Sequence, residues 1–544
     1  MNVHLLYADK EWKRPRPYYD SESIVNDLGL ATLFRVSSRD QEKKKGAVLT
    51  AAQADEHLGE TLKKVMLVPL QTPEEIYYRQ EILQDFLSNE EFTKKLYEHA
   101  RDAIERWERL GKKEIERPGG ARERGIQLVS QVKLLHLFVN VLTEIKALCR
   151  AHMDSFQSKG LRQFAGGILE DYSDEWEAKI RSMLEDITFF CDGEEEYSLI
   201  GSGANQVHQA RMVLSFQVEN GLKLGRFRVD SLETINKKFR KVKEQMTLSE
   251  KMTLTFANVP TTILKNTIML EDLKNLENQV VEYVMNCFQP FMNTCRKFFD
   301  QLYIQSAFYR ACYNLYVRSG NTKLELCYPK VCPTDCLRFK NLTEFSMATF
   351  RNTVPVGNDG DICNKMLLIV TGANQGGKST FLRSLGIAQI MLQCGMFVSA
   401  KSFESGIFPH FFPHFTRRED SAMNSGRLDE ELGRIERIIS HLGKDSIVLL
   451  NESFATTTEE EGSLIAYDII KALTEAGVKV LTVTHLLSFA RQVYEEQRPD
   501  VEFLCAERMA DGRRTYKMIQ SEPELTSFGL DLYDKIISSV ETEV

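Results

Sequence analysis

The sequence of 544 residues lacks several common features, and each absence argues against a class of protein. No apolar run reaches the roughly 18 residues that a membrane-spanning helix needs, so we expect no membrane contact. The first 16 residues are polar, aromatic and charged, which argues against a secretory signal. The eleven cysteines are odd in number and show no CxxC pairs, which argues against a disulfide framework and predicts a reducing, cytoplasmic compartment.

The sequence also lacks an excess of positive charge. It has 69 basic and 77 acidic residues, and its formal net charge is −8. Proteins that bind nucleic acids usually carry a basic domain or stripe, so the overall charge does not indicate this class. The distribution of the basic residues along the chain therefore matters more than their number.

From about residue 62 to residue 317 the hydrophobic pattern is that of α-helices. Thr72, Pro73 and Glu75 predict a helix start, because they supply the cap, the first turn and the closing residue of a capping box. Apolar residues recur at spacings of three and four between residues 273 and 292, which predicts a long helix with one core-facing stripe. A chain of this length should form roughly three to four domains.

An alternating pattern interrupts the helices near residues 212–229. Residues 212–219 alternate between apolar and polar side chains, and Asn220-Gly221 follows them. Asn-Gly between alternating runs predicts a tight turn, because both residues accept positive φ. We therefore expect a small β-hairpin inserted into the helical region.

A basic cluster occupies the second strand of this hairpin and the segment after it. Its members are Lys223, Arg226, Arg228, Lys237, Lys238, Arg240, Lys241 and Lys243. Only Asp230 and Glu233 oppose these charges within the segment. Such a cluster can lie along the phosphate backbone of DNA and release counterions. A solvated helix face beside a charged edge strand has the same composition, so both interpretations stay open.

From about residue 326 short β-rich runs alternate with helical segments. The runs lie at residues 366–370, 446–450 and 478–483. This alternation predicts a parallel sheet flanked by helices.

The first of these runs leads directly into a G-x-x-x-x-G-K-S motif and then into a helix. The loop residues are Gly372, Ala373, Asn374, Gln375, Gly376, Gly377, Lys378, Ser379 and Thr380. Between a strand and a helix, such a loop points backbone N–H groups at phosphate oxygens, and the helix N-terminus adds its positive dipole end. We expect Lys378 to reach the β- and γ-phosphates of ATP and the hydroxyl of Ser379 to bind Mg²⁺.

The other two runs end in polar residues that can complete an ATPase site. Asn451 and Glu452 follow the second run, where such folds place metal-binding and water-activating groups. Glu452 is the candidate that polarises the attacking water, and Ser379, Asn451 and Glu452 are candidate metal ligands. Asn451 stands where an Asp is expected and should support Mg²⁺ more weakly. His485 follows the third run as a candidate sensor of the γ-phosphate, although a histidine after a strand, taken alone, is more often structural.

Together these motifs resemble those of the MutS family, the ATPases named for DNA mismatch repair. The loop is similar to the family's T-G-P-N-M-G-G-K-S-T, and Thr484-His485 matches its T-H. Further similar segments are 69–80 (P-L and I-x-x-R), 356–359 (V-x-N-D), 397–400 (Y-V-P-A), 415–417 (F-T-R), 451–462 (D-E-x-G-R-G-T-S-T-x-D-G) and 527–529 (S-Y-G). The resemblance covers roughly residues 60–535.

The sequence also departs from the family's pattern. The family's S-G-R-S-T-F segment is shortened here at residues 425–432, so Ser425 is a stand-in for the serine that touches the partner subunit's nucleotide. The G-x-F-x-E wedge, whose Phe stacks on a mispaired base, is absent. No segment before the core helices has room for the mismatch-reading and connector domains, so we do not expect mismatch recognition.

The resemblance implies a multidomain fold and a mode of action. Residues 1–60 would form an N-terminal segment, residues 61–325 an α-helical core and lever, and residues 326–544 a P-loop ATPase domain of the ABC type. Two such chains would pair head to tail as a homodimer that binds ATP and Mg²⁺ and closes its levers around DNA. We therefore expect an ATP-gated clamp that acts on branched or otherwise structured double-stranded DNA in repair or recombination. The alternative is a nucleotide-dependent switch whose levers grip a protein partner.

Overall fold

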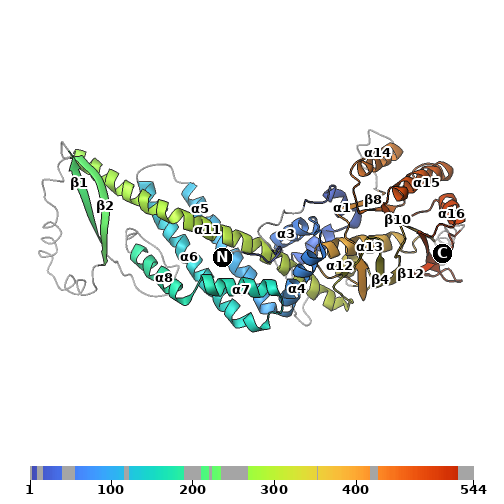
Figure 1. Cartoon of the computed structure of the whole chain (residues 1–544), viewed down its shortest axis with the longest axis horizontal. Helices are drawn as coiled ribbons and strands as arrows, with labels where there is room; N and C mark the ends of the chain where they lie inside the picture. The colour runs from blue at the N-terminus through green and yellow to red at the C-terminus, as the bar shows by residue number, and fades with distance from the viewer. Residues whose placement is uncertain are drawn as a thin grey trace, which may run out of the picture. The chain divides into compact units, whose positions relative to one another are not determined.

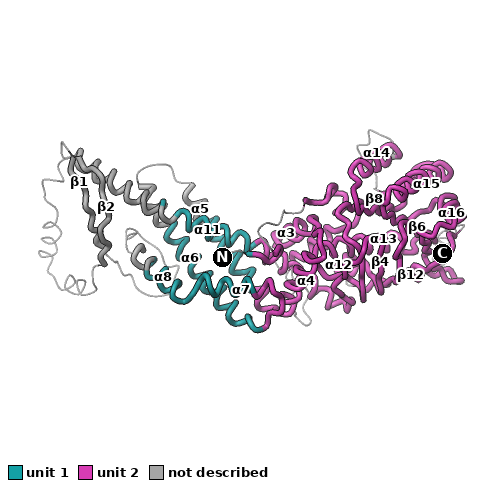
Figure 2. The backbone as a smooth tube through the Cα atoms, viewed as in Figure 1, with its two compact units in different colours: residues 1–3, 95–154, 163–303 teal, residues 4–94, 155–162, 304–544 magenta. Residues whose placement is uncertain are grey.

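The computed structural model describes most of the chain (Figure 1). The described residues are 3–8, 16–39, 55–115, 122–188, 210–219, 223–234, 267–351, 353–416 and 427–524. They belong to two compact units (Figure 2): unit 1 contains residues 1–3, 95–154 and 163–303, and unit 2 contains residues 4–94, 155–162 and 304–544. The boundaries expected near residues 60 and 325 divide the chain differently, because unit 2 collects segments from both ends of the chain.

Unit 1 is built mainly of helices. Its helices are α5 (Glu90–Ile115), α6 (Arg122–His152), η1 (Met153–Ser155), α7 (Lys159–Asp171), α8 (Asp174–Thr188) and α11 (Thr267–Thr322), of which α5, η1, α7 and α11 continue into unit 2. Trp107 of α5 stacks on Phe138 of α6, which stacks in turn on Phe299 of α11, with ring centroids 5.0 and 4.9 Å apart. Such large apolar rings contribute much of the energy of helix packing. The predicted helical region is thus confirmed, and no helix in the described residues is long and apolar enough to cross a membrane.

Unit 1 also contains a two-stranded sheet. The strands β1 (Ala210–Glu219) and β2 (Lys223–Thr234) pair antiparallel from Ala210↔Thr234 to Glu219↔Lys223. Their backbones therefore run as the two arms of a hairpin. The expected Asn220-Gly221 turn lies outside the described residues.

Where the structure describes the N-terminal segments of unit 2, they form four helices before α5. They are α1 (Ser21–Leu28), α2 (Ala31–Ser37), α3 (Glu56–Met66) and α4 (Pro73–Ser88). The predicted capping box of α4 is confirmed: the amide of Glu75 donates to Thr72 Oγ1 at 3.3 Å, and the amide of Thr72 donates to Glu75 Oε2 at 3.1 Å. Within α4, the fully buried Arg79 donates to the carbonyls of Leu6 and Cys394, so it joins the N-terminal segment to the end of α13 (Lys378–Gln393).

Among the described residues, the main sheet of unit 2 has six strands in the order β12-β11-β6-β10-β9-β8. The strands are β6 (Leu367–Gly372), β8 (His410–Phe415), β9 (Ser446–Asn451), β10 (Lys479–Val483), β11 (Val501–Arg508) and β12 (Arg514–Gln520). All neighbours pair in parallel except β11 and β12. The predicted parallel sheet is therefore confirmed. The strands β6, β9 and β10 correspond to the apolar runs predicted at residues 366–370, 446–450 and 478–483.

Helices cover both faces of this sheet. They are α13 (Lys378–Gln393), α14 (Arg427–Ile439), α15 (Glu459–Glu475) and α16 (Leu487–Glu495). One face packs against α14, α15 and α16 in a buried cluster that includes Val448, Ile470 and Phe489. The other face packs against α13, where a Cβ on Gly386 would meet Leu449 Cδ2 at 2.9 Å. Because α13 follows β6 directly, its N-terminus lies at the edge where β6, β9 and β10 end.

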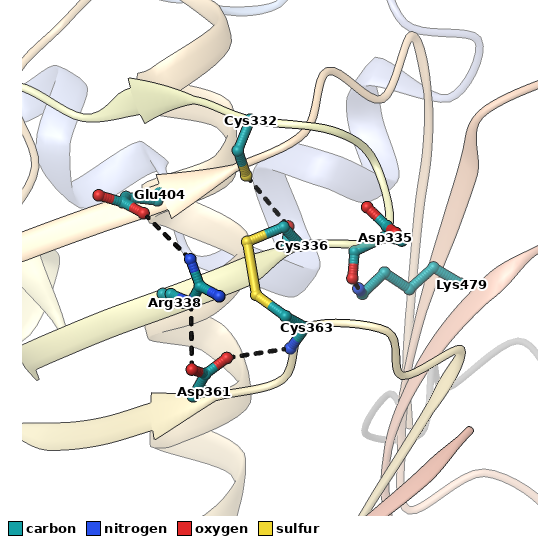
Figure 3. The surroundings of a disulfide bond; sticks show 8 residues. All are labelled: Cys332, Asp335, Cys336, Arg338, Asp361, Cys363, Glu404 and Lys479. Carbon is teal, nitrogen blue, oxygen red and sulfur yellow. Dashed lines mark hydrogen bonds and ion pairs between the residues drawn. A yellow bond between two sulfur atoms is a disulfide. The ribbon is translucent and has the colours of Figure 1, made fainter. Parts of the chain in front are cut away.

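A smaller sheet of four strands adjoins this core, in the order β3-β7-β4-β5. Its elements are β3 (Lys330–Val331), β4 (Leu337–Leu342), β5 (Asn358–Asp361) and β7 (Ser402–Ser405), with α12 (Phe345–Arg351) between β4 and β5. Cys336 and Cys363 form a disulfide beside the β4–β5 pair (Figure 3). The cysteine pattern argued against disulfides and so missed this bond, because 27 residues separate the two cysteines and only the strand pairing makes them neighbours.

Candidate functional site

The glycine-rich loop between β6 and α13 adopts backbone conformations that favour glycine. Gly372 and Gly377 have φ values of 108° and 91°. A Cβ on Gly372 would lie 2.8 Å from the amide nitrogen of Ala506, and one on Gly376 would lie 2.8 Å from the carbonyl oxygen of Ala373. The loop therefore folds tightly against β11, and the absence of side chains at these positions makes that possible.

Lys378 is the first residue of α13, and its side chain turns back over the loop. Its Nζ donates to the carbonyls of Gly372 at 2.8 Å and Ala373 at 3.0 Å. The side chain is almost fully buried, and this burial lowers the pKa of Lys378, while the nearby carboxylate of Glu452 opposes the shift. A buried ammonium whose two hydrogen-bond acceptors are neutral carbonyls is well placed to bind an anion at the loop.

Glu452 and His485 meet at the ends of β9 and β10. Asn451 pairs in register with Val483, so the residues that follow these two strands lie side by side. His485 Nε2 donates to Glu452 Oε1 at 3.1 Å. This hydrogen bond lowers the pKa of Glu452 and outweighs the effect of partial burial, so the carboxylate is held in its charged form. Glu452 itself has a φ of 55°, in the left-handed region, which turns the chain sharply after the strand.

Asn451 Oδ1 is buried and has no hydrogen-bond partner among the described residues. A buried acceptor without a partner costs free energy, so the atom fits a position beside a cation or its bound water. No group of three or more His, Cys, Asp and Glu side chains in the described ranges could hold a metal ion. The available oxygen donors of Ser379, Asn451 and Glu452 instead suit Mg²⁺, which commonly takes one or two protein oxygens together with phosphate and water.

One cavity of about 520 Å³ brings the loop and the strand ends together. Its walls include the sequence-predicted residues Asn374, Gln375, Gly376, Gly377, Lys378, Ser379, Thr380, Glu452 and His485. Gly372, Ala373 and Asn451 do not line the cavity, although the first two hold Lys378 through their carbonyls. The structure therefore brings a cationic loop and a carboxylate–histidine pair to the wall of one cavity.

The remaining wall of this cavity was not predicted from the sequence. It consists of Leu342, Glu344, Met347, Thr353, Val354, Pro355, Val356, Asn358, Phe381, Ser384 and Tyr516. Only the similarity of residues 356–359 to a family motif could have predicted part of this wall from the sequence. Val354 and Val356 are 57% and 40% exposed, which gives the cavity an apolar side suited to a flat ring.

Several predicted site residues lie beyond the part of the chain that the structure describes. They are Ser425 and the basic residues Lys237, Lys238, Arg240 and Lys241. Lys223, Arg226 and Arg228 lie on β2, for which only the backbone is described. The roles of these residues remain predictions.

The helix that follows the Ser425 segment is tied to the site. Glu431 of α14 is buried and accepts hydrogen bonds from the amide of Phe454 at 2.8 Å and from Thr456 Oγ1 at 3.0 Å. Both donors belong to the loop after β9 that begins at Glu452. A displacement of α14 would therefore move the loop at Phe454, two residues from Glu452, the candidate catalytic residue.

Two family models match the chain. The model of the MutS2 N-terminal domain matches residues 71–320, and the model of MutS domain V matches residues 368–539. The DNA mismatch repair protein MutS of Thermotoga neapolitana is 33% identical over 138 residues, which are 25% of this chain and 17% of that relative. Endonuclease MutS2 of Lacticaseibacillus casei is 33% identical over 132 residues, 24% of this chain and 17% of the relative. Endonuclease MutS2 of Pelotomaculum thermopropionicum is 31% identical over 160 residues, 29% of this chain and 20% of the relative. The chain thus matches at most a fifth of the length of these three proteins.

Proposed function

We propose that this chain, which belongs to the MutS family, is an ATPase that couples nucleotide binding and hydrolysis to the binding of DNA. The observation that carries the proposal is the cavity shared by the glycine-rich loop, Lys378 and the Glu452–His485 pair. A cationic loop at a helix N-terminus binds phosphates, and a charged carboxylate across from it can act on water. The matched MutS domain V supports the same assignment.

In the proposed mechanism each group has a separate task. Lys378 exchanges its two loop carbonyls for the β- and γ-phosphate oxygens, and the loop amides hold the remaining phosphate charge. Glu452 orients the attacking water and accepts its proton, while His485 fixes the carboxylate through its 3.1 Å hydrogen bond. When bound, Mg²⁺ neutralises phosphate charge that builds up during transfer. Ser379, Asn451 and Glu452 are the residues proposed to hold it.

Replacement of Asn451 by aspartate should strengthen the metal site. In Asn451→Asp a charged oxygen would take the place of the buried amide oxygen, and charge-assisted contacts are about twice as strong as neutral ones. We expect the Mg²⁺ concentration for half-maximal ATP hydrolysis to fall by about tenfold. Asn451→Leu, which has no side-chain oxygen, should raise the Mg²⁺ concentration for half-maximal hydrolysis. Identical Mg²⁺ titrations for all three proteins would remove Asn451 from the proposed metal ligands.

The proposal extends to an assembly of two chains. Two sheet-containing units would pair head to tail, with the Ser425 segment of one chain facing the nucleotide of the other. The contact of Glu431 with the loop after β9 supports this idea, because it offers a path from that segment to Glu452. ATP binding would tighten the pair, and the helical regions would close on double-stranded DNA that is branched or otherwise structured.

Filter binding tests the DNA partner. Branched DNA should bind more tightly than plain or mismatched duplex of equal length, and its affinity should change with ATP. Charge reversal at Lys237, Lys238, Arg240 and Lys241 should weaken binding to every DNA, and the slope of log affinity against log salt should fall by about one for each side chain that no longer neutralises a phosphate. The double variant Lys340→Glu with Lys401→Glu is the control and should have little effect, because Lys340 is exposed on β4 and Lys401 is exposed directly before β7. Equal affinity for all three DNAs, unaffected by nucleotide, would refute the clamp.

A second candidate function follows from the net charge of −8. An acidic chain whose basic residues merely form a solvated face would act as a nucleotide-dependent switch on a protein partner. In that case the charge reversal would leave DNA affinity weak and unchanged, while nucleotide binding at the loop would persist.

A further inference from the structure

The Cys336–Cys363 disulfide closes a segment of the chain, residues 337–362, that forms one wall of the nucleotide cavity. Cys336 directly precedes β4, and Cys363 follows the end of β5 by two residues (Figure 3). Eight residues that line the cavity, from Leu342 to Asn358, lie between the two cysteines in the sequence. The disulfide is therefore a covalent link across the base of this wall segment.

The paired strands β4 and β5 connect the disulfide to the cavity. Next to the disulfide, the amide of Ile362 donates to the carbonyl of Leu337 at 2.8 Å. Further along the same strands, Leu342 pairs with Asn358, and both residues line the cavity. Asn358 Oδ1 also accepts a hydrogen bond from the amide of Met518 at 2.7 Å, which ties β5 to β12. A change at the base of β4 and β5 therefore reaches the cavity through strand pairing.

The ion pair that joins these strands beside the disulfide is weak. Arg338 Nε donates to Asp361 Oδ2 at 3.1 Å, but the two side chains are 53% and 63% exposed. Such an exposed ion pair contributes little to stability, because water screens it. The strand pairing is also interrupted, since its register shifts between Phe339 and Leu342. Without the disulfide, the wall segment would therefore sample more conformations.

One end of the disulfide is open to solvent. Cys336 is buried, whereas Cys363 is partly exposed. A thiolate can therefore attack Sγ of Cys363, which breaks the S–S bond, forms a mixed disulfide at Cys363 and releases Cys336 as a thiolate that takes up a proton. The second thiolate of a dithiol then attacks the mixed disulfide and releases Cys363. Both cysteines end as thiols, and the dithiol loses two electrons and becomes a disulfide itself.

We propose that the Cys336–Cys363 disulfide is a redox-active modification site, whose reduction by a dithiol loosens the wall segment and weakens nucleotide binding. This inference rests on the proposed function of the cavity and adds a means of regulating it. With the bond intact, the wall segment is already ordered before ATP binds. After reduction, the cost of ordering it falls on the binding step, so we expect ATP affinity to fall by about five- to tenfold.

The test compares the oxidised full chain with the same chain reduced by dithiothreitol. Peptide mass spectrometry after alkylation of free thiols verifies the state of the bond, and equilibrium titration with ATP measures the affinity. The reduced chain should bind ATP about five- to tenfold more weakly than the oxidised chain. The double variant Cys336→Ser with Cys363→Ser should bind ATP as the reduced wild type does and should not respond to dithiothreitol. Amide hydrogen exchange in residues 337–362 should be faster in both the reduced chain and the double variant.

Cys332→Ser is the matched control. Cys332 lies beside the disulfide, where its Sγ donates to the carbonyl of Cys336 at 3.5 Å (Figure 3). Burial raises the pKa of Cys332 to about 11, so its thiol stays protonated and this variant should respond to dithiothreitol as wild type does.

Three results would overturn the proposal. They are equal ATP affinity of the oxidised and reduced wild type, a response to dithiothreitol that persists in the double variant, and absence of the cross-linked peptide from the oxidised chain. Failure of ATP to bind either form would instead refute the proposed function of the cavity, and this inference with it.

Discussion

Lys378→Ala is expected to reduce ATP affinity by about 10- to 100-fold and ATP turnover by at least about 100-fold. The substitution removes the buried ammonium that we assign to the β- and γ-phosphates. It also leaves the carbonyls of Gly372 and Ala373 without the donor that now satisfies them, so the loop loses its preorganised shape. Both effects act on the phosphate end of the cavity. Binding of a fluorescent ATP analogue and steady-state phosphate release measure the two changes separately.

Lys401→Ala is the matched control for this substitution. Lys401 is an exposed lysine in the same unit and does not line the cavity. Its loss removes the same charge from the chain, so it should leave affinity and turnover near the wild-type values. Wild-type turnover in Lys378→Ala would show that the cavity is not where ATP is hydrolysed.

Glu452→Gln is expected to separate hydrolysis from binding. Glutamine has the size of glutamate and can adopt the same backbone φ of 55°, but it cannot accept a proton from water. Loss of a general base typically costs about 100- to 10,000-fold in rate. ATP affinity should stay within a few fold of wild type, because Lys378 and the loop amides remain. Single-turnover hydrolysis and equilibrium binding, each with and without branched DNA, check both parts.

Glu460→Gln is the control for the loss of one negative charge near the site. Glu460 is exposed in the first turn of α15 and is not part of the cavity wall. It should hydrolyse ATP as wild type does. A Glu452→Gln protein with normal turnover would move the catalytic role to another group, and a wild type as slow as Glu452→Gln would favour a nucleotide-dependent switch over an active ATPase.

Local features of the sequence were enough to predict several elements correctly. The capping box at Thr72 depends on residues within one turn, so the start of α4 could be placed without knowledge of its neighbours. The three apolar runs in the second half of the chain became β6, β9 and β10, because strands buried on both faces of a parallel sheet are apolar throughout. Glu452 and His485 were each singled out from the sequence, and the structure brings them together because both come directly after strands that end at the same edge of the sheet.

Other features depend on residues far apart in the chain. Asp27 and Arg434 form a buried ion pair at 2.7 Å across 407 residues, which joins α1 to α14. Neither residue lies in a sequence motif that predicts contact with the other. The N-terminal segment expected at residues 1–60 stays a prediction, and residues 4–94 cluster with the sheet-containing unit.

By itself, the sequence determined the strand–loop–helix at Lys378, the polar residues at the strand ends and the helical character of the first half, because each follows from short-range pattern and backbone preference. Only the tertiary structure decided which distant side chains complete the cavity. Glu344 and Tyr516 reach its wall from opposite sides of the loop in sequence, and the Cys336–Cys363 bond forms only because β4 and β5 pair. The physical reason is that such contacts arise when strands and helices pack, and no periodicity along the chain encodes which side chain will meet which.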